Sequence, residues 1–270
     1  MHAKRWLTAV IILPLLLTLI LKGGLLLFTF LIASVSVVAQ WEYYRIVFSD
    51  HIPKVNWYYP FWGYLFGVGI PVSAGFGHSD TAAILLAISA IGAATLSIFR
   101  FKTSTDAPMV VLKQVFGVIY IPLLLSFAVL LYRSNSGIHW VLLLLLVVSG
   151  GDTGAFYAGT YFGRNKLCPA VSPKKTVEGS IGGLAAGVLL SLGYALLLFD
   201  RISLSYALAF ALVVGVSGQA GDLFESEFKR VADVKDSGNL LPGHGGFLDR
   251  IDAILFAAPT AYIFKECLPI

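Results

Sequence analysis

Charged residues are scarce in this sequence. Asp, Glu, Lys and Arg make up 13% of its 270 residues, whereas about a quarter of the residues in soluble domains are charged. Hydrophobic residues account for 57%, and the mean hydropathy is +0.82. This composition excludes a soluble globular domain. It predicts an all-α integral membrane protein, because unpaired backbone groups are not tolerated in lipid and helices satisfy them internally.

Cysteine is also scarce, since Cys168 and Cys267 are the only two in the chain. In the topology predicted below they lie on opposite sides of the membrane and cannot pair, so neither a disulfide framework nor thiol chemistry is expected. The net charge of +4 suits anionic lipid headgroups and phosphate-bearing ligands. No nucleic-acid-binding module is apparent in the sequence.

Long hydrophobic runs dominate what is present. A helix needs about 20 apolar residues to cross a bilayer, and nine stretches reach or approach that length. The sixth is short unless its helix continues through Asp152 toward Phe162. The first follows a basic start but has no cleavage site, so we interpret it as a retained helix. The stretches are about Trp6–Leu21, Gly24–Gln40, Trp57–Phe76, Thr81–Phe99, Gln114–Tyr132, Ile138–Gly151, Gly179–Phe199, Ser203–Gly221 and Phe247–Phe264.

The Lys and Arg residues predict the orientation. With the N-terminus in the cytoplasm, most of them fall on the cytoplasmic side, and the other side receives only Lys22, Arg133, Arg201 and Lys265. This asymmetry follows the positive-inside rule. Nine crossings would then leave the C-terminus outside, with the polar loops of the second half at the cytoplasmic leaflet of the cell membrane.

The two halves of the chain differ in where their polar residues lie. Residues 1–140 are predicted to be anchoring helices and a dimer scaffold, with aromatic clusters at residues 41–44 and 57–59 that we expect in interfacial belts. Residues 141–270 are predicted to be the catalytic part, because their polar residues gather in two cytoplasmic loops, at residues 150–180 and 221–252.

Small residues recur every four positions in the second half. They form two stripes, which we expect to pack closely either within the helix bundle or across a homodimer. The stripes are Gly151, Ala155, Gly159 and Gly163, and Gly179, Gly183 and Gly187.

Five acidic residues occur at the ends of apolar helices, where lipid would exclude isolated charges. They are Asp152, Asp222, Glu225, Asp249 and Asp252. If the helix from Ser203 continues past Asp222, then Asp222 and Glu225 share one face with Ser226 and Lys229, and Asp249 and Asp252 share a face of the last helix. Carboxylates from two helices would repel each other unless a cation lies between them. Mg²⁺ held by Asp222 and Asp249 fits this requirement.

An alternative interpretation is that these acids form Asp–Arg and Asp–Lys ion pairs, with Arg230 and Arg250 among the partners. Cations are also close in sequence: Lys174 and Lys175 in a polar loop, and Lys229 beside Arg230. Lys and Arg bind phosphate groups, and the Gly245–Gly246 backbone would let an anion approach closely. Cations around carboxylates therefore suggest a polyphosphate ligand.

Residues 226–252, SEFKRVADVKDSGNLLPGHGGFLDRID, resemble the signature of the phosphatidate cytidylyltransferases, also called CDP-diacylglycerol synthases. The resemblance rests on fixed polar positions, including Lys229–Arg230, Lys235–Asp236, His244–Gly245–Gly246, Asp249–Arg250 and Asp252. The block GDTGAFYAGTYFGRNKLCPAVSPKKTVEGSIGG is similar to a second stretch of that family. The first half of the chain matches only in general hydrophobicity.

The resemblance implies that CTP and phosphatidate react to give CDP-diacylglycerol and pyrophosphate. It also implies a Mg²⁺ requirement, carried onto Asp222 and Asp249, assistance by a monovalent cation such as K⁺, and a homodimer. The expected catalytic residues are Asp222, Asp249, Lys229, Arg230, His244 and Asp252. The expected substrate-binding residues are Ser172, Lys174, Lys175, Thr176, Glu225, Ser226, Lys235, Asp236, Gly245, Gly246 and Arg250.

Three other functions compete with this interpretation. Phosphatidyltransferases that consume CDP-diacylglycerol use a longer Asp-rich pattern that this sequence lacks. A CTP-dependent lipid or polyprenol kinase would use similar ligands. A cation-coupled transporter would place its acids near the midplane of the bilayer, often in paired repeats, whereas these acids are predicted at one interface and no repeat is seen.

Overall fold

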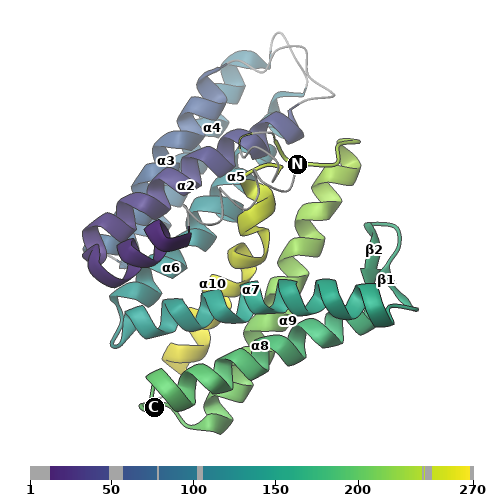
Figure 1. Cartoon of the computed structure of the whole chain (residues 1–270). Helices are drawn as coiled ribbons and strands as arrows, with labels where there is room; N and C mark the ends of the chain where they lie inside the picture. Colours follow the sequence, from purple (N-terminus) through teal and green to yellow (C-terminus); the bar gives the residue numbers. More distant parts are fainter. Residues whose placement is uncertain are drawn as a thin grey trace. The chain divides into compact units, whose positions relative to one another are not determined.

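The computed structural model of the protein describes residues 13–48, 57–77, 79–101, 106–238, 240 and 245–267. The chain divides into two compact units, whose helices Figure 1 colours along the sequence. The first unit comprises Met1–Arg133 and Val231–Arg250, and the second comprises Ser134–Arg230 and Ile251–Ile270. The predicted division at residue 140 separated an anchoring part from a catalytic part, and it stays a prediction.

The first unit is built from apolar helices. Helix Leu13–Lys22 precedes α2 (Gly24–Val47), α3 (Tyr58–Phe76) and α4 (Ser79–Arg100). The next segments, α5 (Ala107–Val118), the π-helical η1 (Ile119–Leu123) and α6 (Leu124–Arg133), form one continuous helix. Pro122 lies within η1. Proline lacks an N–H group and its ring displaces the preceding turn, and the wider π turn accommodates this.

The aromatic residues near the end of α2 correct one prediction. Trp41 and Trp57 are exposed, as interfacial anchors would be, but Tyr43 and Tyr44 are 2% and 3% exposed, and Tyr59 is fully buried. These tyrosines are core residues of the first unit. The prediction of anchoring was wrong for them because aromatic clusters at a helix end suit a buried helix–helix contact as well as a membrane interface.

The second unit contains α7 (Gly137–Phe162), a two-stranded antiparallel sheet of β1 (Lys166–Cys168) and β2 (Ser172–Thr176), α8 (Val177–Leu198), α9 (Leu204–Val231) and most of α10 (Leu248–Cys267). The sheet connects α7 to α8 (Figure 1). This small sheet differs from the prediction of an all-α protein, in which these residues formed a loop.

The stripes of small residues pack against each other within the second unit. A Cβ atom on Gly183 would lie 2.7 Å from the carbonyl oxygen of Gly151, and one on Gly179 would lie 3.0 Å from that of Ala155. Because a side chain at these positions would collide with backbone, α7 and α8 approach as closely as they do only through glycine. Packing within the bundle, one of the two alternatives, is confirmed.

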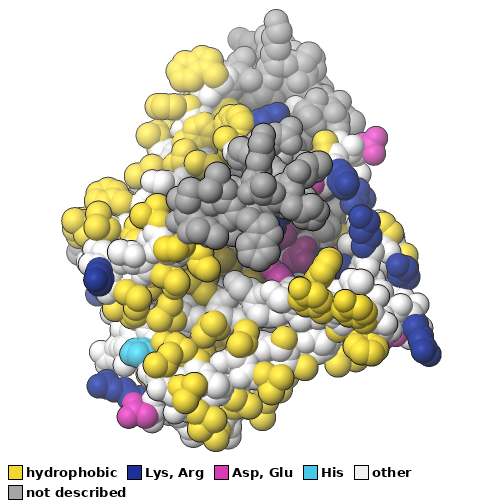
Figure 2. All heavy atoms as spheres, viewed as in Figure 1, with side chains coloured by type: hydrophobic (Ala, Val, Ile, Leu, Met, Phe, Trp, Pro, Cys, Tyr) yellow, Lys and Arg dark blue, Asp and Glu magenta, His cyan; other side chains and the backbone are white. Residues whose placement is uncertain are grey.

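In the part of the chain that the structure describes, six helices are long and apolar enough to cross a membrane: Gly24–Val47, Asp80–Phe99, Ala107–Arg133, Gly137–Phe162, Val177–Leu198 and Leu204–Val231. This confirms a mainly α-helical membrane protein. The predicted continuation of the sixth segment through Asp152 is also confirmed, since α7 runs to Phe162. On the face seen in Figure 2, hydrophobic side chains cover much of the surface, as lipid contact requires.

Candidate active site

The acidic face predicted on α9 exists, because the helix continues to Val231. Along it, Glu225 is fully buried and Ser226 and Lys229 are nearly so. Glu225 forms an ion pair with Lys229 one turn later. The Ser226 hydroxyl donates a hydrogen bond to the carbonyl oxygen of Asp222 at 2.9 Å, so in this structure it is bonded within its own helix.

Asp222 is joined to the hairpin that precedes α8. The distance from Lys175 Nζ to Asp222 Oδ2 is 2.6 Å, and both side chains are about a third exposed. The sequence pattern predicted a loop for the SPKKT residues, but they form strand β2. Strand pairing with β1 fixes where Lys175 projects, whereas a loop would leave it loosely placed.

The hairpin is held at its base by hydrogen bonds from several elements. Thr176, predicted to bind substrate, is the N-cap of α8, and its Oγ1 accepts from the Gly179 N–H at 3.1 Å. Arg230 Nε donates to the carbonyl oxygen of Val171 at 3.0 Å, which ties the end of α9 to the hairpin. Ser172 is half-buried at the start of β2, and Lys174 is exposed.

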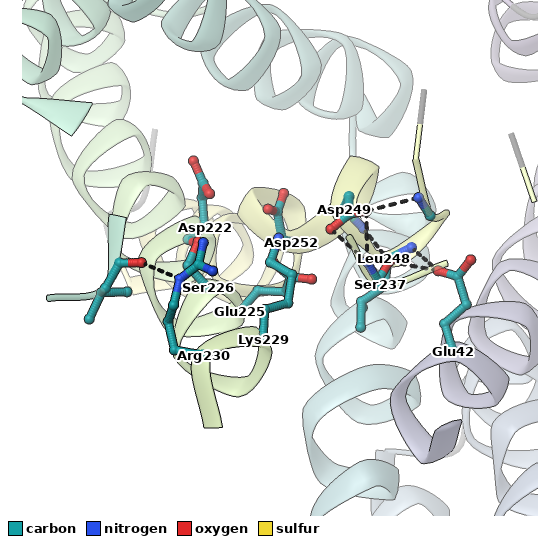
Figure 3. A network of polar contacts seen from close by, with 12 residues as sticks. Glu42, Asp222, Glu225, Ser226, Lys229, Arg230, Ser237, Leu248, Asp249 and Asp252 are labelled. Atoms are coloured by element: carbon teal, nitrogen blue, oxygen red, sulfur yellow. Dashed lines mark hydrogen bonds and ion pairs between the residues drawn. The ribbon is translucent and has the colours of Figure 1, made fainter. Parts of the chain in front are cut away.

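Asp252 completes a cluster of charges in the second unit. It is 9% exposed, and the charges of Asp222, Glu225 and Lys229 act on its carboxyl group. A Cβ atom on Gly221 would lie 2.6 Å from the Asp252 carbonyl oxygen, so glycine at that position lets α9 and α10 approach. Figure 3 shows these side chains from the two helices.

We call Lys175, Asp222, Glu225, Lys229 and Asp252 the Asp222 cluster. It brings three carboxylates together with two ammonium groups. The alternative of ion pairing is therefore found in part, as pairs of Lys175 with Asp222 and of Lys229 with Glu225. With all three carboxyl groups ionised, negative charge would exceed positive charge in the cluster, and a further cation would balance it.

The first unit holds a second polar cluster, around Asp249 (Figure 3). The Asp249 carboxylate accepts the backbone N–H of Ser237 at 3.0 Å and that of Gly246 at 2.8 Å. The Gly246 amide, expected to face a bound anion, is thus bonded to an internal one. Gly245 has a φ of +80°, a conformation that favours glycine.

The remaining predicted residues of the segment between α9 and α10 lie as follows. Lys235, Asp236 and Arg250 are exposed. Asp236 lies near Gly245, since a Cβ atom on Gly245 would be 3.6 Å from Asp236 Oδ1. His244 lies outside the described residues.

Sequence reasoning missed Glu42. This residue of α2 is fully buried, and its Oε2 accepts hydrogen bonds from Leu248 N–H at 2.7 Å and Ser237 Oγ at 3.0 Å. The sequence signal that could have identified it is a single carboxylate among aromatic residues. That aromatic cluster was interpreted as an interfacial anchor. We call Glu42, Ser237, Gly246, Leu248 and Asp249 the Glu42 cluster.

The predicted metal ligands belong to different units, Asp222 to the second and Asp249 to the first. Among the described residues, no group of three or more His, Cys, Asp or Glu side chains is arranged to hold a metal ion. Mg²⁺ needs fewer protein ligands, because water and substrate phosphate complete its shell. A carboxylate offers about four lone-pair sites, so the two amides bonded to Asp249 do not by themselves exhaust it. The donor chemistry therefore fits Mg²⁺, and joint binding stays a proposal.

Comparison with known proteins identifies the family. The model of the cytidylyltransferase family matches residues 3–268. A phosphatidate cytidylyltransferase of Staphylococcus saprophyticus is 35% identical over 269 residues, covering 96% of this chain and 97% of the relative. One of Staphylococcus aureus is 31% identical over 262 residues, with the same coverage. One of Thermotoga maritima is 40% identical over 180 residues, covering 63% of this chain and 66% of the relative. The chain belongs to the cytidylyltransferase family, as the resemblance of its polar segments predicted.

Proposed function

We propose that the protein transfers the cytidylyl group of CTP to phosphatidate, forming CDP-diacylglycerol and pyrophosphate. The observation that carries this proposal is the family match along nearly the whole chain, with relatives named phosphatidate cytidylyltransferase aligned over 96% of it. The Asp222 cluster adds chemical support, because it combines carboxylates and ammonium groups as a site for a metal-bound polyphosphate would.

The reaction needs no covalent intermediate on the protein. An oxygen of the phosphatidate phosphate attacks the α-phosphorus of CTP, a new P–O bond forms, and the bond to the β-phosphate breaks to release pyrophosphate. Because the phosphomonoester is already an anionic nucleophile, the protein contributes positioning and neutralisation of charge.

Cationic side chains take the second of these tasks. In this proposal Lys174, Lys175, Lys229 and Arg230 neutralise the phosphates. The ion pair with Asp222 orients Lys175, and the bond from Nε to Val171 orients the Arg230 guanidinium. The other expected substrate-binding residues, together with the turn containing His244, hold the nucleotide and the lipid headgroup.

Asp222 and Asp249 are the residues that would hold Mg²⁺. When bound, the ion supplies charge neutralisation and orientation of phosphate oxygens. Asp252 and Asp236 support the two ligands from neighbouring positions. In the second unit, the packing of Gly221 against α10 keeps Asp252 beside α9.

We propose further that the chain crosses the cell membrane nine times, with the N-terminus and active site on the cytoplasmic side. Among the described residues, six helices meet the length and hydropathy needed for a crossing. Two contacts support placing the linked ends on the same side of the membrane, and the distribution of Lys and Arg supports the cytoplasmic side. Glu42 joins the C-terminal end of α2 to the segment between α9 and α10, and Lys175 joins the β-hairpin to α9. Both contacts link ends that the proposed topology puts on the cytoplasmic side.

A homodimer and a monovalent cation such as K⁺ complete the proposal. Both follow from the family resemblance. Light scattering of the detergent-solubilised protein measures the first. Activity with K⁺ replaced by a bulky organic cation measures the second.

The decisive experiment follows the two ends of the CTP triphosphate. Purified protein in phosphatidate vesicles is given CTP labelled at either the α- or the γ-phosphorus, with and without Mg²⁺. We expect the α-label in a lipid product and the γ-label in pyrophosphate, only with Mg²⁺. A γ-label in lipid would instead identify a kinase, and cation flux without CTP would identify a transporter. Either result would overturn the proposal.

A further inference from the structure

Glu42 contacts the segment that carries Asp249, although it lies about two hundred positions earlier in the sequence. We propose that Glu42 is a positioning residue for the cytidylyl transfer: its carboxylate holds the backbone at residues 237–238 and 245–248 in the arrangement that presents Asp249. This inference rests on the proposed function and extends it to a residue outside the polar loops of the second half.

The contacts form a closed chain from Glu42 to Asp249. Ser237 Oγ donates to Glu42 Oε2 at 3.0 Å and accepts the backbone N–H of Asp249 at 3.3 Å. The Asp249 carboxylate in turn accepts the Ser237 N–H at 3.0 Å and the Gly246 N–H at 2.8 Å. Ser237 is thus hydrogen-bonded to Asp249 near the start of α10, and Glu42 connects this pair to α2.

Glu42 also acts at the start of α10. The first N–H groups of a helix have no partner within the helix, and Glu42 Oε2 accepts that of Leu248 at 2.7 Å. A negative charge at a helix N-terminus is also favoured by the helix dipole. Glu42 therefore fixes where α10 begins, one residue before Asp249.

The packing around Glu42 leaves no room for other side chains. A Cβ atom on Gly246 would collide with Ser237 Oγ and lie 2.8 Å from Glu42 Oε2, and one on Gly238 would lie 2.8 Å from the Glu42 side-chain carboxyl carbon. The two glycines thus let the backbone of the segment close around the carboxylate, independently of the hydrogen bonds.

Helix α2, which carries Glu42, is itself anchored in the first unit. Its neighbours Tyr43 and Tyr44 donate hydrogen bonds to the backbone carbonyls of Lys113 and Gln114, each at 3.2 Å. Both tyrosine rings pack against Gly117 of α5 and occupy the space that a side chain at that position would fill. Because α2 is anchored on α5 at this height, the Glu42 carboxylate is held in place rather than following the segment.

The test compares Glu42→Gln with the wild-type protein, full-length in lipid nanodiscs. Glutamine has nearly the same shape but loses the charge and one acceptor oxygen. We expect kcat to fall about tenfold or more, because small misplacement of reacting groups is costly. We also expect faster hydrogen–deuterium exchange of the backbone amides at residues 237–238 and 245–248, and no change in α8.

Glu266→Gln is the matched control, since it makes the same change at an exposed residue paired with Lys265. It should leave both kcat and exchange at wild-type values. Ser237→Ala is the second variant, and it decides the question should Glu42→Gln fail to fold. If Glu42 acts through Ser237, the double variant should lose no more activity than the more damaging single variant.

The proposal is overturned if the foldable variants keep the wild-type kcat and exchange. The two readouts also separate this inference from the proposed function. A wild-type protein that makes no CDP-lipid would refute the function. In that case faster exchange in the variants would still support the positioning role, and unchanged exchange would reject it.

Discussion

Lys175 Nζ lies 2.6 Å from Asp222 Oδ2, which joins a strand of the β-hairpin to α9. The sequence pattern predicts different tasks for the two residues, phosphate binding for Lys175 and metal binding for Asp222. The contact brings an expected phosphate-binding cation beside one of the two expected metal ligands. A lysine and a carboxylate in contact also hold each other's side chain in position before substrate arrives.

Lys175→Met tests the role of this cation. Methionine keeps much of the apolar length but removes the charge, and a lost charge-assisted hydrogen bond corresponds to a rise of about tenfold or more in the KM for CTP. Steady-state kinetics with CTP as the varied substrate measure this. Lys166→Met, in the partner strand of the same hairpin, is the control and should change the KM little. An unchanged KM in Lys175→Met would leave the lysine with a topological role.

Asp249→Asn removes a charge expected to bind Mg²⁺ while keeping an oxygen that accepts the amides of Ser237 and Gly246. We expect turnover to fall more than about 100-fold, as when a main electrostatic group of an active site is lost, while the folded protein still reaches the membrane. Activity across a Mg²⁺ titration and gel filtration in detergent measure the two effects. Asp200→Asn makes the same change at an exposed turn. Near-normal activity of Asp249→Asn at saturating Mg²⁺ would remove Asp249 from the metal site.

Gly183→Ala should destabilise the second unit, because the added Cβ would lie 2.7 Å from the Gly151 carbonyl oxygen. Overpacking of this kind costs about 1–3 kcal/mol. Gly193→Ala is the matched control in the same helix, where a Cβ would meet nothing within 4 Å. There alanine should be neutral or stabilise by up to about 1 kcal/mol. Thermal unfolding followed by tryptophan fluorescence should give shifts that differ in size or sign. Equal Tm values for both variants would contradict close packing of α7 on α8.

The two native cysteines test the proposed topology, and no further cysteine has to be introduced. Cys168 in β1 and Cys267 at the end of α10 are both free, and the topology puts them on opposite sides of the membrane. A membrane-impermeant maleimide added to intact cells should label Cys267, and Cys168 only after permeabilisation. The single variants Cys168→Ser and Cys267→Ser assign each signal. Labelling of both residues in intact cells would put them on the same side and so refute the three crossings, α8, α9 and α10, proposed between Cys168 and Cys267.

The sequence by itself determined the class of protein and the family. Scarce charge and long apolar runs are sufficient for a helical membrane protein, because lipid leaves few other ways to satisfy the backbone. The i, i+3, i+4 and i+7 spacing of Asp222, Glu225, Ser226 and Lys229 correctly predicted a shared helix face, since that relation is local. The fixed polar positions of residues 226–252 were sufficient for the family.

Only the tertiary structure decided which groups meet. That Lys175 pairs with Asp222, that the glycine stripes face each other, and that Glu42 bonds to Ser237 and Leu248 are contacts between segments far apart in sequence. No periodicity encodes such contacts, because each depends on how helices pack and on where a glycine lets backbone approach. For this reason a lone glutamate among tyrosines was interpreted as part of an interfacial anchor, whereas packing of α2 places it against the start of α10.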